Sequence, residues 1–255
     1  MTSPLRVSVS PLRAGELLLP EEAARYVARV HRLAVGDPLE LFDPQLGLRA
    51  AARLVEVSKR RVRCLVEEPA WTPDAHRLPI ALVQGLGKAD KPERVVRDAT
   101  ALGAARVVLI ESERSAAKLA SAERVAQRRA RLEAVACEAA RQCLRPQVPE
   151  IVGPLAFSAW LPHITARGLL LDPKAESPLL QALSRLLPAP VAADAAEVSL
   201  LIGPEGGFAP GEIQRAVAAG AQRVRFGGLI LRTETAATAV LGAALAWCEA
   251  GHRVD

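Results

Sequence analysis

Between Val198 and Trp247, a short apolar run, a glycine-rich loop and a helical segment follow one another twice. The first glycine loop is Gly203-Pro204-Glu205-Gly206-Gly207-Phe208, and the second glycine loop runs from Phe226 to Thr235. Loops that leave the carboxyl ends of neighbouring parallel strands converge on one crevice, and ligands bind there. The pattern therefore predicts an α/β domain whose ligand site is built from these two loops.

The same alternation of strands and helices extends back to about residue 80. Apolar runs predict strands at 80–84, 106–110, 168–171, 198–202 and 223–226. The segments between and after them predict helices at 92–103, 121–144, 177–187, 210–219 and 233–249. Strands that alternate with helices in this way indicate a parallel sheet.

The N-terminal part of the chain has a different pattern, which predicts strands at 6–10, 38–42, 48–58 and 61–67 with turns between them. This pattern indicates a small β-rich barrel. Pro69, Pro73 and Pro79 lie among polar residues where the pattern changes, as is typical of a domain boundary. We therefore expect one domain over residues 1–70 and a second over residues 71–255.

The chain is basic, with 33 Lys and Arg against 28 Asp and Glu and a net charge of +5. This charge is compatible with a polyanionic partner such as RNA. A helix predicted to begin near Pro20 carries Arg25, Arg29 and Arg32 at a spacing that would place three guanidinium groups on one face. Such a face either contacts RNA phosphates or is simply solvated, and the pattern alone leaves both interpretations open.

Four cysteines and four histidines show neither the spacing of metal ligands nor that of a disulfide framework. We therefore expect no metal, and reduced thiols. Residues 1–15 lack the apolar segment of a signal peptide, and the longest apolar run, Ala236 to Trp247, is too short to span a bilayer. The sequence predicts a soluble cytoplasmic protein without membrane contact.

The last predicted helix is apolar nearly all round and rich in alanine. A helix of this kind is buried on more than one side. It lies either in the core of the domain or beneath a second subunit.

Glycine in both loops permits positive φ and lets a ligand approach backbone N–H groups closely. Neither loop has the spacing of a dinucleotide-binding or P-loop motif. Ordinary glycine turns would explain either loop taken alone, and Thr233 and Glu234 suit the start of a helix. Such turns do not explain the charged residues on the two loops, which are Glu205 on the first and Arg232 and Glu234 on the second. These residues lie where the ligand crevice of the sheet is expected.

Together these residues resemble the RsmE family of the SPOUT superfamily. The first glycine loop, Gly227 and the segment Ile230-Leu231-Arg232-Thr233-Glu234-Thr235-Ala236 look like the family's two signature loops. Shorter matches occur along the whole chain: Val27 to Asp37, Lys88, Leu102-Gly103, Ser112-Glu113-Arg114, Glu138 to Gln142, Arg145, and Val148-Pro149-Glu150. The family's members are bacterial enzymes that use S-adenosylmethionine to methylate N3 of one uridine in small-subunit (16S) ribosomal RNA.

The resemblance implies an N-terminal PUA-like β-barrel that helps to hold RNA and a C-terminal SPOUT-type α/β domain with a deep trefoil knot. It implies a homodimer whose active site lies near the subunit interface. Its cofactor pocket would consist of Leu171, Pro173, Ile202, Gly203, Pro204, Gly206, Phe226, Gly227, Ile230 and Leu231. The substrate would be small-subunit ribosomal RNA or the assembled small subunit, bound by Arg25, Arg29, Arg32, Lys88, Gln142 and Arg145.

Three positions depart from the family's pattern. Ala101 stands where the family usually has a glutamate, Leu229 where arginine is common, and Gly228 where lysine or proline is common. The first departure removes a carboxylate that the family has there, and the other two put RNA contacts at the rim of the pocket in doubt. The segment from Ile230 to Ala236 is intact.

Methylation of uridine N3 requires an unpaired or flipped base and removal of the N3 proton. Our hypothesis is that Arg232 stabilises negative charge on the uracil carbonyl oxygens. Glu205 or Glu234 would accept the proton or orient Arg232. Two alternatives are a non-catalytic RNA-binding or ribosome-assembly protein of the same fold, and a SPOUT methyltransferase that acts on another RNA.

Overall fold

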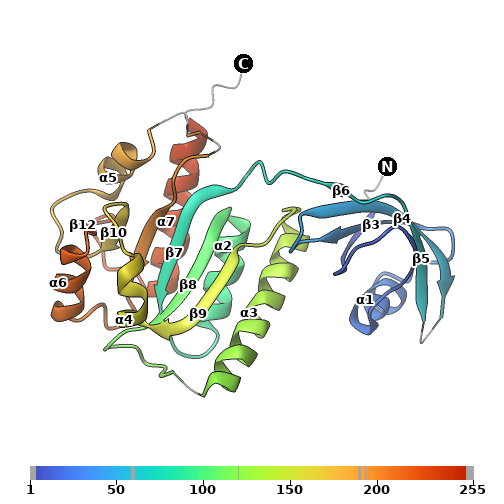
Figure 1. Ribbon diagram of the computed structural model, residues 1–255, viewed down its shortest axis with the longest axis horizontal. Coiled ribbons are helices and arrows are strands. Elements are labelled where there is room, and N and C mark those ends of the chain that lie inside the picture. Colours follow the sequence, from blue (N-terminus) through green and yellow to red (C-terminus); the bar gives the residue numbers. More distant parts are fainter. Residues whose placement is uncertain (1–3, 59–60, 120, 189–190, 193, 251–255) are drawn as a thin grey trace. The chain divides into compact units, whose positions relative to one another are not determined.

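The computed structural model describes residues 4–58, 61–119, 121–188, 191–192 and 194–250 (Figure 1). The chain divides into two compact units. The N-terminal unit is Met1–His76 with Cys137–Val148, and the C-terminal unit is Arg77–Ala136 with Pro149–Asp255. The sequence predicts a boundary after residue 70 and gives no sign that residues 137–148 pack with the N-terminal unit.

The strands of the N-terminal unit form one mixed sheet in the order β1-β3-β4-β5-β2, with β6 paired to β4. They are β1 (Leu5–Ser8), β2 (Gly15–Leu18), β3 (Pro38–Asp43), β4 (Leu48–Val57), β5 (Val62–Val66) and β6 (Ala70–Trp71). Buried and exposed residues alternate along β5 and most of β4, as is typical of a sheet with one face on a core. The PUA-like barrel stays a prediction.

The helix predicted near Pro20 is shorter than the arginine spacing suggests. It consists of α1 (Glu21–Arg25) and a π-helical turn, η1 (Tyr26–Val30). The N–H of His31 donates to the carbonyl of Tyr26 at 3.1 Å and closes this wide turn. Arg32 then adopts a positive φ of 54°, outside the helix. The expectation of three arginines on one helical face is therefore wrong for Arg32, because the chain leaves the helix first.

Arg145 is a second correction, because it is buried rather than open to RNA. Its Nε lies 2.8 Å from Asp74 Oδ2, and the two side chains are only 4% and 2% exposed. The Arg145 carbonyl also accepts a hydrogen bond from the guanidinium of Arg6 at 3.0 Å. The residue therefore stabilises the N-terminal unit and cannot reach a phosphate on the surface.

Replacing Arg145 with alanine is expected to lower the free energy of unfolding by about 3–5 kcal/mol, because the Asp74 carboxylate would stay buried without its partner. Chemical denaturation measures this loss, and Gln142→Ala, an exposed neighbour, serves as the control with little change. An Arg145→Ala variant of normal stability and reduced RNA affinity would contradict the structural role.

The C-terminal unit contains a parallel sheet in the order β12-β10-β11-β7-β8-β9 (Figure 1). Its strands are β7 (Leu78–Gly85), β8 (Ala104–Glu111), β9 (Glu150–Ala156), β10 (Gly168–Leu171), β11 (Val198–Ile202) and β12 (Gln222–Val224). Every residue of β7 is buried, which indicates that both faces of the sheet are covered. The predicted α/β fold with a parallel sheet is confirmed, whereas the knot stays a prediction.

The helices of the C-terminal unit are α2 (Lys91–Ala101), α4 (Phe157–Trp160), η2 (Leu161–His163), α5 (Leu179–Leu186), α6 (Pro210–Ala218) and α7 (Thr233–Ala250), together with α3 (Ala122–Gln142) as far as Ala136. Helices α2 and α7 pack on each other and on β8 and β7. Residues of α4 and α6 share another cluster with Val108 and Leu201 of the sheet. Successive strand residues point to opposite faces, so the two groups of helices enclose the sheet.

Helix α7 buries one side and leaves another partly open. Ala237, Val240, Leu241 and Ala244 are buried. The small residues Ala239, Gly242, Ala243 and Ala246 are partly or fully exposed on the other side. Within the described ranges, no helix is long and apolar enough to cross a membrane, and no group of three or more His, Cys, Asp or Glu side chains is placed to hold a metal ion.

Candidate active site

A cavity of about 1230 Å³ lies at the ends of neighbouring strands of the sheet. Its wall includes the loops after β12, β10 and β11, together with Lys91 at the start of α2 and Arg114 after β8. After β7 the chain continues to β8, which lies toward the β9 edge of the sheet. After β11 it continues to β12, which lies at the opposite edge. Strands β7 and β11 are neighbours, so the sheet has a topological switch point between them. Crevices at such points are where open α/β sheets bind ligands.

All the residues expected to form the cofactor pocket line this cavity. Glu205 and Arg232 line it as well. Glu234 lies behind the wall, with its side chain 16% exposed. The structure thus brings both glycine loops and the loop at Leu171 to one place, as the sequence predicts.

Backbone forms a large part of the cavity wall. A Cβ on Gly203 would lie 2.9 Å from the carbonyl carbon of Gly207, so only glycine fits without a shift. Gly207 and Gly227 have φ values of +68° and +69°, a region that side chains disfavour. A ligand can therefore approach peptide groups in both loops directly.

A buried hydrogen-bond network joins the two glycine loops. The Thr233 hydroxyl donates to the carbonyl of Gly203 at 2.6 Å. Gln84 Nε2, from the end of β7, donates to the Thr233 hydroxyl at 2.7 Å. Gln84 is 2% exposed and Thr233 is 6% exposed. The bond from Thr233 therefore ties the start of α7 to the first glycine loop.

Lys91 lies between the two candidate carboxylates, although no motif in the sequence selects it. Its Nζ is 3.0 Å from Glu205 Oε1 and 3.2 Å from Glu234 Oε2. The backbone N–H of Lys88 also donates to Glu205 Oε1, at 3.2 Å. A lysine in the first turn of a helix is disfavoured by the helix dipole, and this misplacement was the one sign in the sequence that acidic partners lie nearby.

These contacts set the charge states of the three groups. Burial raises the pKa of Glu205, but hydrogen bonds from its own backbone, from Lys91 and from the Lys88 N–H outweigh it and lower that pKa. The pKa of Glu234 is also lowered: burial opposes this, while its backbone hydrogen bond, Lys91 and the charge of Arg232 favour it. The pKa of Lys91 is raised, mainly by Glu205. All three groups are ionised at neutral pH.

A second ion pair ties the loop at Leu171 to β12. Arg223 donates from Nε to Asp172 Oδ2 at 2.9 Å, and the N–H of Lys174 donates to Asp172 Oδ1 at 2.9 Å. All three residues line the cavity. Because this pairing joins positions 51 residues apart, periodicity along the sequence gave no sign of it.

The departures from the family's pattern fall in two places. Ala101 is exposed at the end of α2 and does not line the cavity. Gly228 and Leu229 do line it. The side chains of Leu229 and Ile230 are 82% and 86% exposed, an unusual state for neighbouring large apolar residues and one that suits a surface covered by a ligand or partner.

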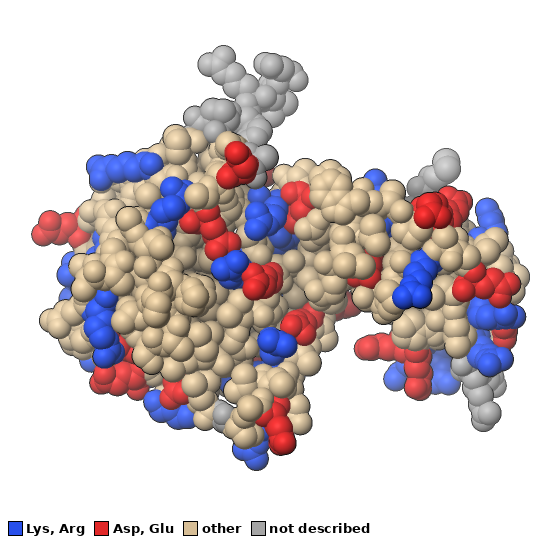
Figure 2. Space-filling view, viewed as in Figure 1, with Lys and Arg blue, Asp and Glu red and all other residues tan. Residues whose placement is uncertain are grey.

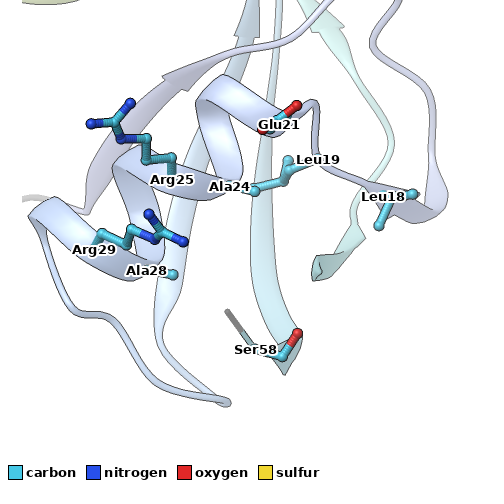
Figure 3. A pocket seen from close by; sticks show the side chains of 8 residues that line it. All are labelled: Leu18, Leu19, Glu21, Ala24, Arg25, Ala28, Arg29 and Ser58. Carbon is cyan, nitrogen blue, oxygen red and sulfur yellow. The ribbon is translucent and has the colours of Figure 1, made fainter. Parts of the chain in front are cut away.

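The expected RNA-binding residues other than Arg145 are exposed: Arg25, Arg29, Arg32, Lys88 and Gln142. Arg25 and Arg29 line a smaller cavity of about 430 Å³ in the N-terminal unit. Figure 3 shows that these arginines project from the helical segment, with Ser58 on another side of the cavity. The cavity wall also includes Leu18, Leu19, Glu21, Ala24 and Ala28, so it combines apolar and charged groups.

The chain is similar to known proteins along most of its length. The family described as RNA methyltransferase domain matches residues 74–245. The chain is 33% identical over 226 residues to ribosomal RNA small subunit methyltransferase E of Bacillus subtilis, with 87% of this chain and 86% of the relative covered. It is 33% identical over 228 residues to the protein of the same name from Mycobacterium bovis, with 86% of this chain and 81% of that relative covered.

Two solved structures are similar over nearly the whole chain. A putative methyltransferase from Legionella pneumophila, in complex with S-adenosylmethionine, superposes with a TM-score of 0.82 at 26% identity and covers 96% of this chain and 98% of its own. A ribosomal RNA small subunit methyltransferase E from Neisseria gonorrhoeae, also bound to S-adenosylmethionine, superposes with a TM-score of 0.79 at 26% identity. The match covers 94% of this chain and 96% of the Neisseria chain.

The parallel sheet and the cavity at its switch point define an α/β protein built to bind a small molecule beside a charged wall. The chain belongs to the RNA methyltransferase family, and within it to the ribosomal RNA small subunit methyltransferases E.

Proposed function

We propose that this chain uses S-adenosylmethionine to methylate N3 of one uridine in small-subunit ribosomal RNA. The observation that carries the proposal is the cavity at the switch point, which gathers both signature loops and places Arg232 on the same wall. The Legionella and Neisseria relatives bind S-adenosylmethionine, and the named relatives act on small-subunit ribosomal RNA.

The residues of the cavity fit this cofactor. Apolar side chains such as Leu171, Ile202 and Phe226 can hold an adenine ring, while the glycine-rich backbone can pair with its polar groups. A Cβ on Gly203 would meet the backbone of Gly207 and Phe208, so the first glycine loop folds closely on itself and presents backbone rather than a side chain at this position. When bound, S-adenosylmethionine supplies an electrophilic methyl group.

Arg232 is the residue that we assign to the uracil. It is exposed on the cavity wall at the start of α7, where a guanidinium can donate to a carbonyl oxygen of the base. As N3 loses its proton to solvent water, negative charge spreads onto those oxygens. A fixed cation at this position stabilises the transition state more than the ground state.

The carboxylates suit positioning better than proton removal. Glu205 and Glu234 have lowered pKa values, and a carboxylate with a lowered pKa is a weaker base. Glu234 also lies within electrostatic reach of Arg232. We assign Glu234 to orienting Arg232 and Glu205 to holding Lys91.

RNA would meet the enzyme through dispersed basic residues rather than one dominant patch. On the face in Figure 2, the basic and acidic side chains of the described residues are interspersed over both units. Selection of one uridine would then depend on RNA shape and on the cavity, while arginines supply affinity through phosphates.

Reversing the charge of Arg29 and Arg32 together is expected to weaken RNA binding and its dependence on salt. Removing one interaction with a phosphate of a single strand lowers the slope of log affinity against log salt by about 0.7. Fluorescence anisotropy at several salt concentrations measures the RNA affinity and this slope. Arg13→Glu is the control, because Arg13 is exposed and lies outside the helix. An unchanged slope would exclude this surface as an RNA-binding surface.

A homodimer is part of the proposal. The partly open face of small residues on α7 and the exposed Leu229 and Ile230 support it, since apolar surfaces of this kind are normally covered. Sedimentation velocity is expected to show a dimer at micromolar concentration. A monomer throughout would contradict it.

The proposed reaction is tested with the purified protein, S-adenosylmethionine carrying a labelled methyl group, and small-subunit ribosomal RNA. After digestion to nucleosides, mass spectrometry is expected to find the label in N3-methyluridine. Label in a ribose methyl group would indicate a different RNA methyltransferase. Cofactor and RNA binding without transfer would indicate a non-catalytic binding protein.

A further inference from the structure

Lys91, Glu205 and Glu234 form a charge cluster that joins three separate segments of the C-terminal unit. Lys91 lies in the first turn of α2, Glu205 in the first glycine loop and Glu234 in the first turn of α7. The two ion-pair distances of 3.0 and 3.2 Å mean that one ammonium group serves both carboxylates.

The three groups together carry one excess negative charge, which the guanidinium of Arg232 on the same wall offsets. Arg232 also acts on Glu234 through its charge, and the N–H of Lys88 donates to Glu205. The three side chains are between 16% and 34% exposed, so water screens them only in part. A change of one charge within the cluster will therefore be felt at the cavity wall.

Two of the three groups, Lys91 and Glu205, line the cavity that contains the expected cofactor loops. S-adenosylmethionine carries a positively charged sulfonium, whereas the product S-adenosylhomocysteine has a neutral sulfur. The two molecules share every other charged group. A nearby charge in the protein thus acts on the difference between them, whereas apolar walls and backbone hydrogen bonds act on both almost equally.

We propose that the charges of the Lys91, Glu205 and Glu234 cluster set how strongly the cavity prefers the charged methyl donor over the neutral demethylated product. This inference rests on the cofactor part of the proposed function, but not on the identity of the RNA or of the methylated atom. Its consequence is that product inhibition depends on the balance of charge in the cluster. A single cation shared by two carboxylates keeps both of them in place, so the loss of any one of the three charges changes the charge that faces the cofactor.

Opposite charge changes provide the test. Isothermal titration calorimetry gives the dissociation constants of S-adenosylmethionine and S-adenosylhomocysteine, and their ratio reports the preference. Glu205→Gln removes a negative charge and is expected to reduce the preference for S-adenosylmethionine about threefold to tenfold. Lys91→Met removes a positive charge at similar side-chain length and is expected to increase the preference by a similar factor.

Arg94→Met is the matched control, because it removes one positive charge from the same helix. Arg94 is exposed, pairs with Asp90 and does not line the cavity. The ratio of the two dissociation constants in Arg94→Met is expected to equal that of the wild type. Glu234→Gln is a second neutralisation, expected to act in the same direction as Glu205→Gln, and it replaces that variant if the loop substitution prevents folding.

A purely structural role would weaken the binding of both ligands by the same factor and leave the ratio unchanged. An unchanged ratio, or a shift in the same direction for Lys91→Met and Glu205→Gln, would overturn the inference. If the wild-type protein binds neither ligand, the proposed function fails, and this inference fails with it. If both ligands bind and the ratio of their dissociation constants does not change in the charge variants, only the role of the cluster is overturned.

Discussion

Replacing Arg232 with alanine is expected to lower kcat for methyl transfer about a hundredfold to a thousandfold, because the variant lacks the cation that we assign to the developing charge on the base. The dissociation constant of S-adenosylmethionine should change little, since the cofactor residues that we propose in the second glycine loop, Phe226, Gly227, Ile230 and Leu231, are unchanged. Single-turnover kinetics with small-subunit ribosomal RNA, together with calorimetry for the cofactor, separates the two effects.

Two further variants sharpen the assignment of Arg232. Arg232→Lys keeps the positive charge but not the paired donors, so a partial recovery of kcat is expected. Arg215→Ala removes an exposed arginine of α6 that does not line the cavity, and it should behave like the wild type. Turnover by Arg232→Ala within a few-fold of normal would remove Arg232 from the mechanism.

Replacing Gly203 with alanine is expected to weaken binding of S-adenosylmethionine about tenfold to a hundredfold. The new Cβ would lie 2.9 Å from backbone atoms of Gly207 and Phe208, so the first glycine loop would have to shift. Such strain typically costs about 1–3 kcal/mol. Calorimetry measures the affinity, and thermal unfolding shows how much of the strain appears as lost stability.

Gly228→Ala is the matched control for Gly203→Ala. Gly228 lines the same cavity, but a Cβ there would meet nothing within 4 Å. Its affinity for the cofactor should stay close to that of the wild type. If both variants bound the cofactor as the wild type does, the first glycine loop would not be a wall of the cofactor site.

Much of the C-terminal unit could be predicted because its strands are buried on both faces and therefore appear as continuous apolar runs. Strands β7, β8, β10 and β11 lie where those runs occur. Strand β9 was not predicted, since Gly153 and Pro154 interrupt its pattern. The position of the cavity followed from the strand ends and the glycines, because the switch point depends on the order of elements.

The electrostatic part of the site depends on contacts between distant segments and was only partly predictable. The sequence points to Glu205 and Glu234 but not to their shared partner Lys91, because nothing local to Lys91 shows which loops it meets. The resemblance assigns Arg145 to RNA, whereas the burial of Arg145 depends on Asp74, which is 71 residues away. The arginine spacing predicts Arg32 on a helix, because it does not show that the helix ends in a π-helical turn.

The central claim is that this chain methylates N3 of one uridine in small-subunit ribosomal RNA. The most direct test maps modified nucleotides in the small-subunit ribosomal RNA of cells that lack the gene, and of the same cells that carry either the wild-type gene or the Arg232→Ala variant. The account predicts that one N3-methyluridine disappears on deletion and returns only with the wild-type gene. An unchanged set of N3-methyluridines after deletion would contradict it.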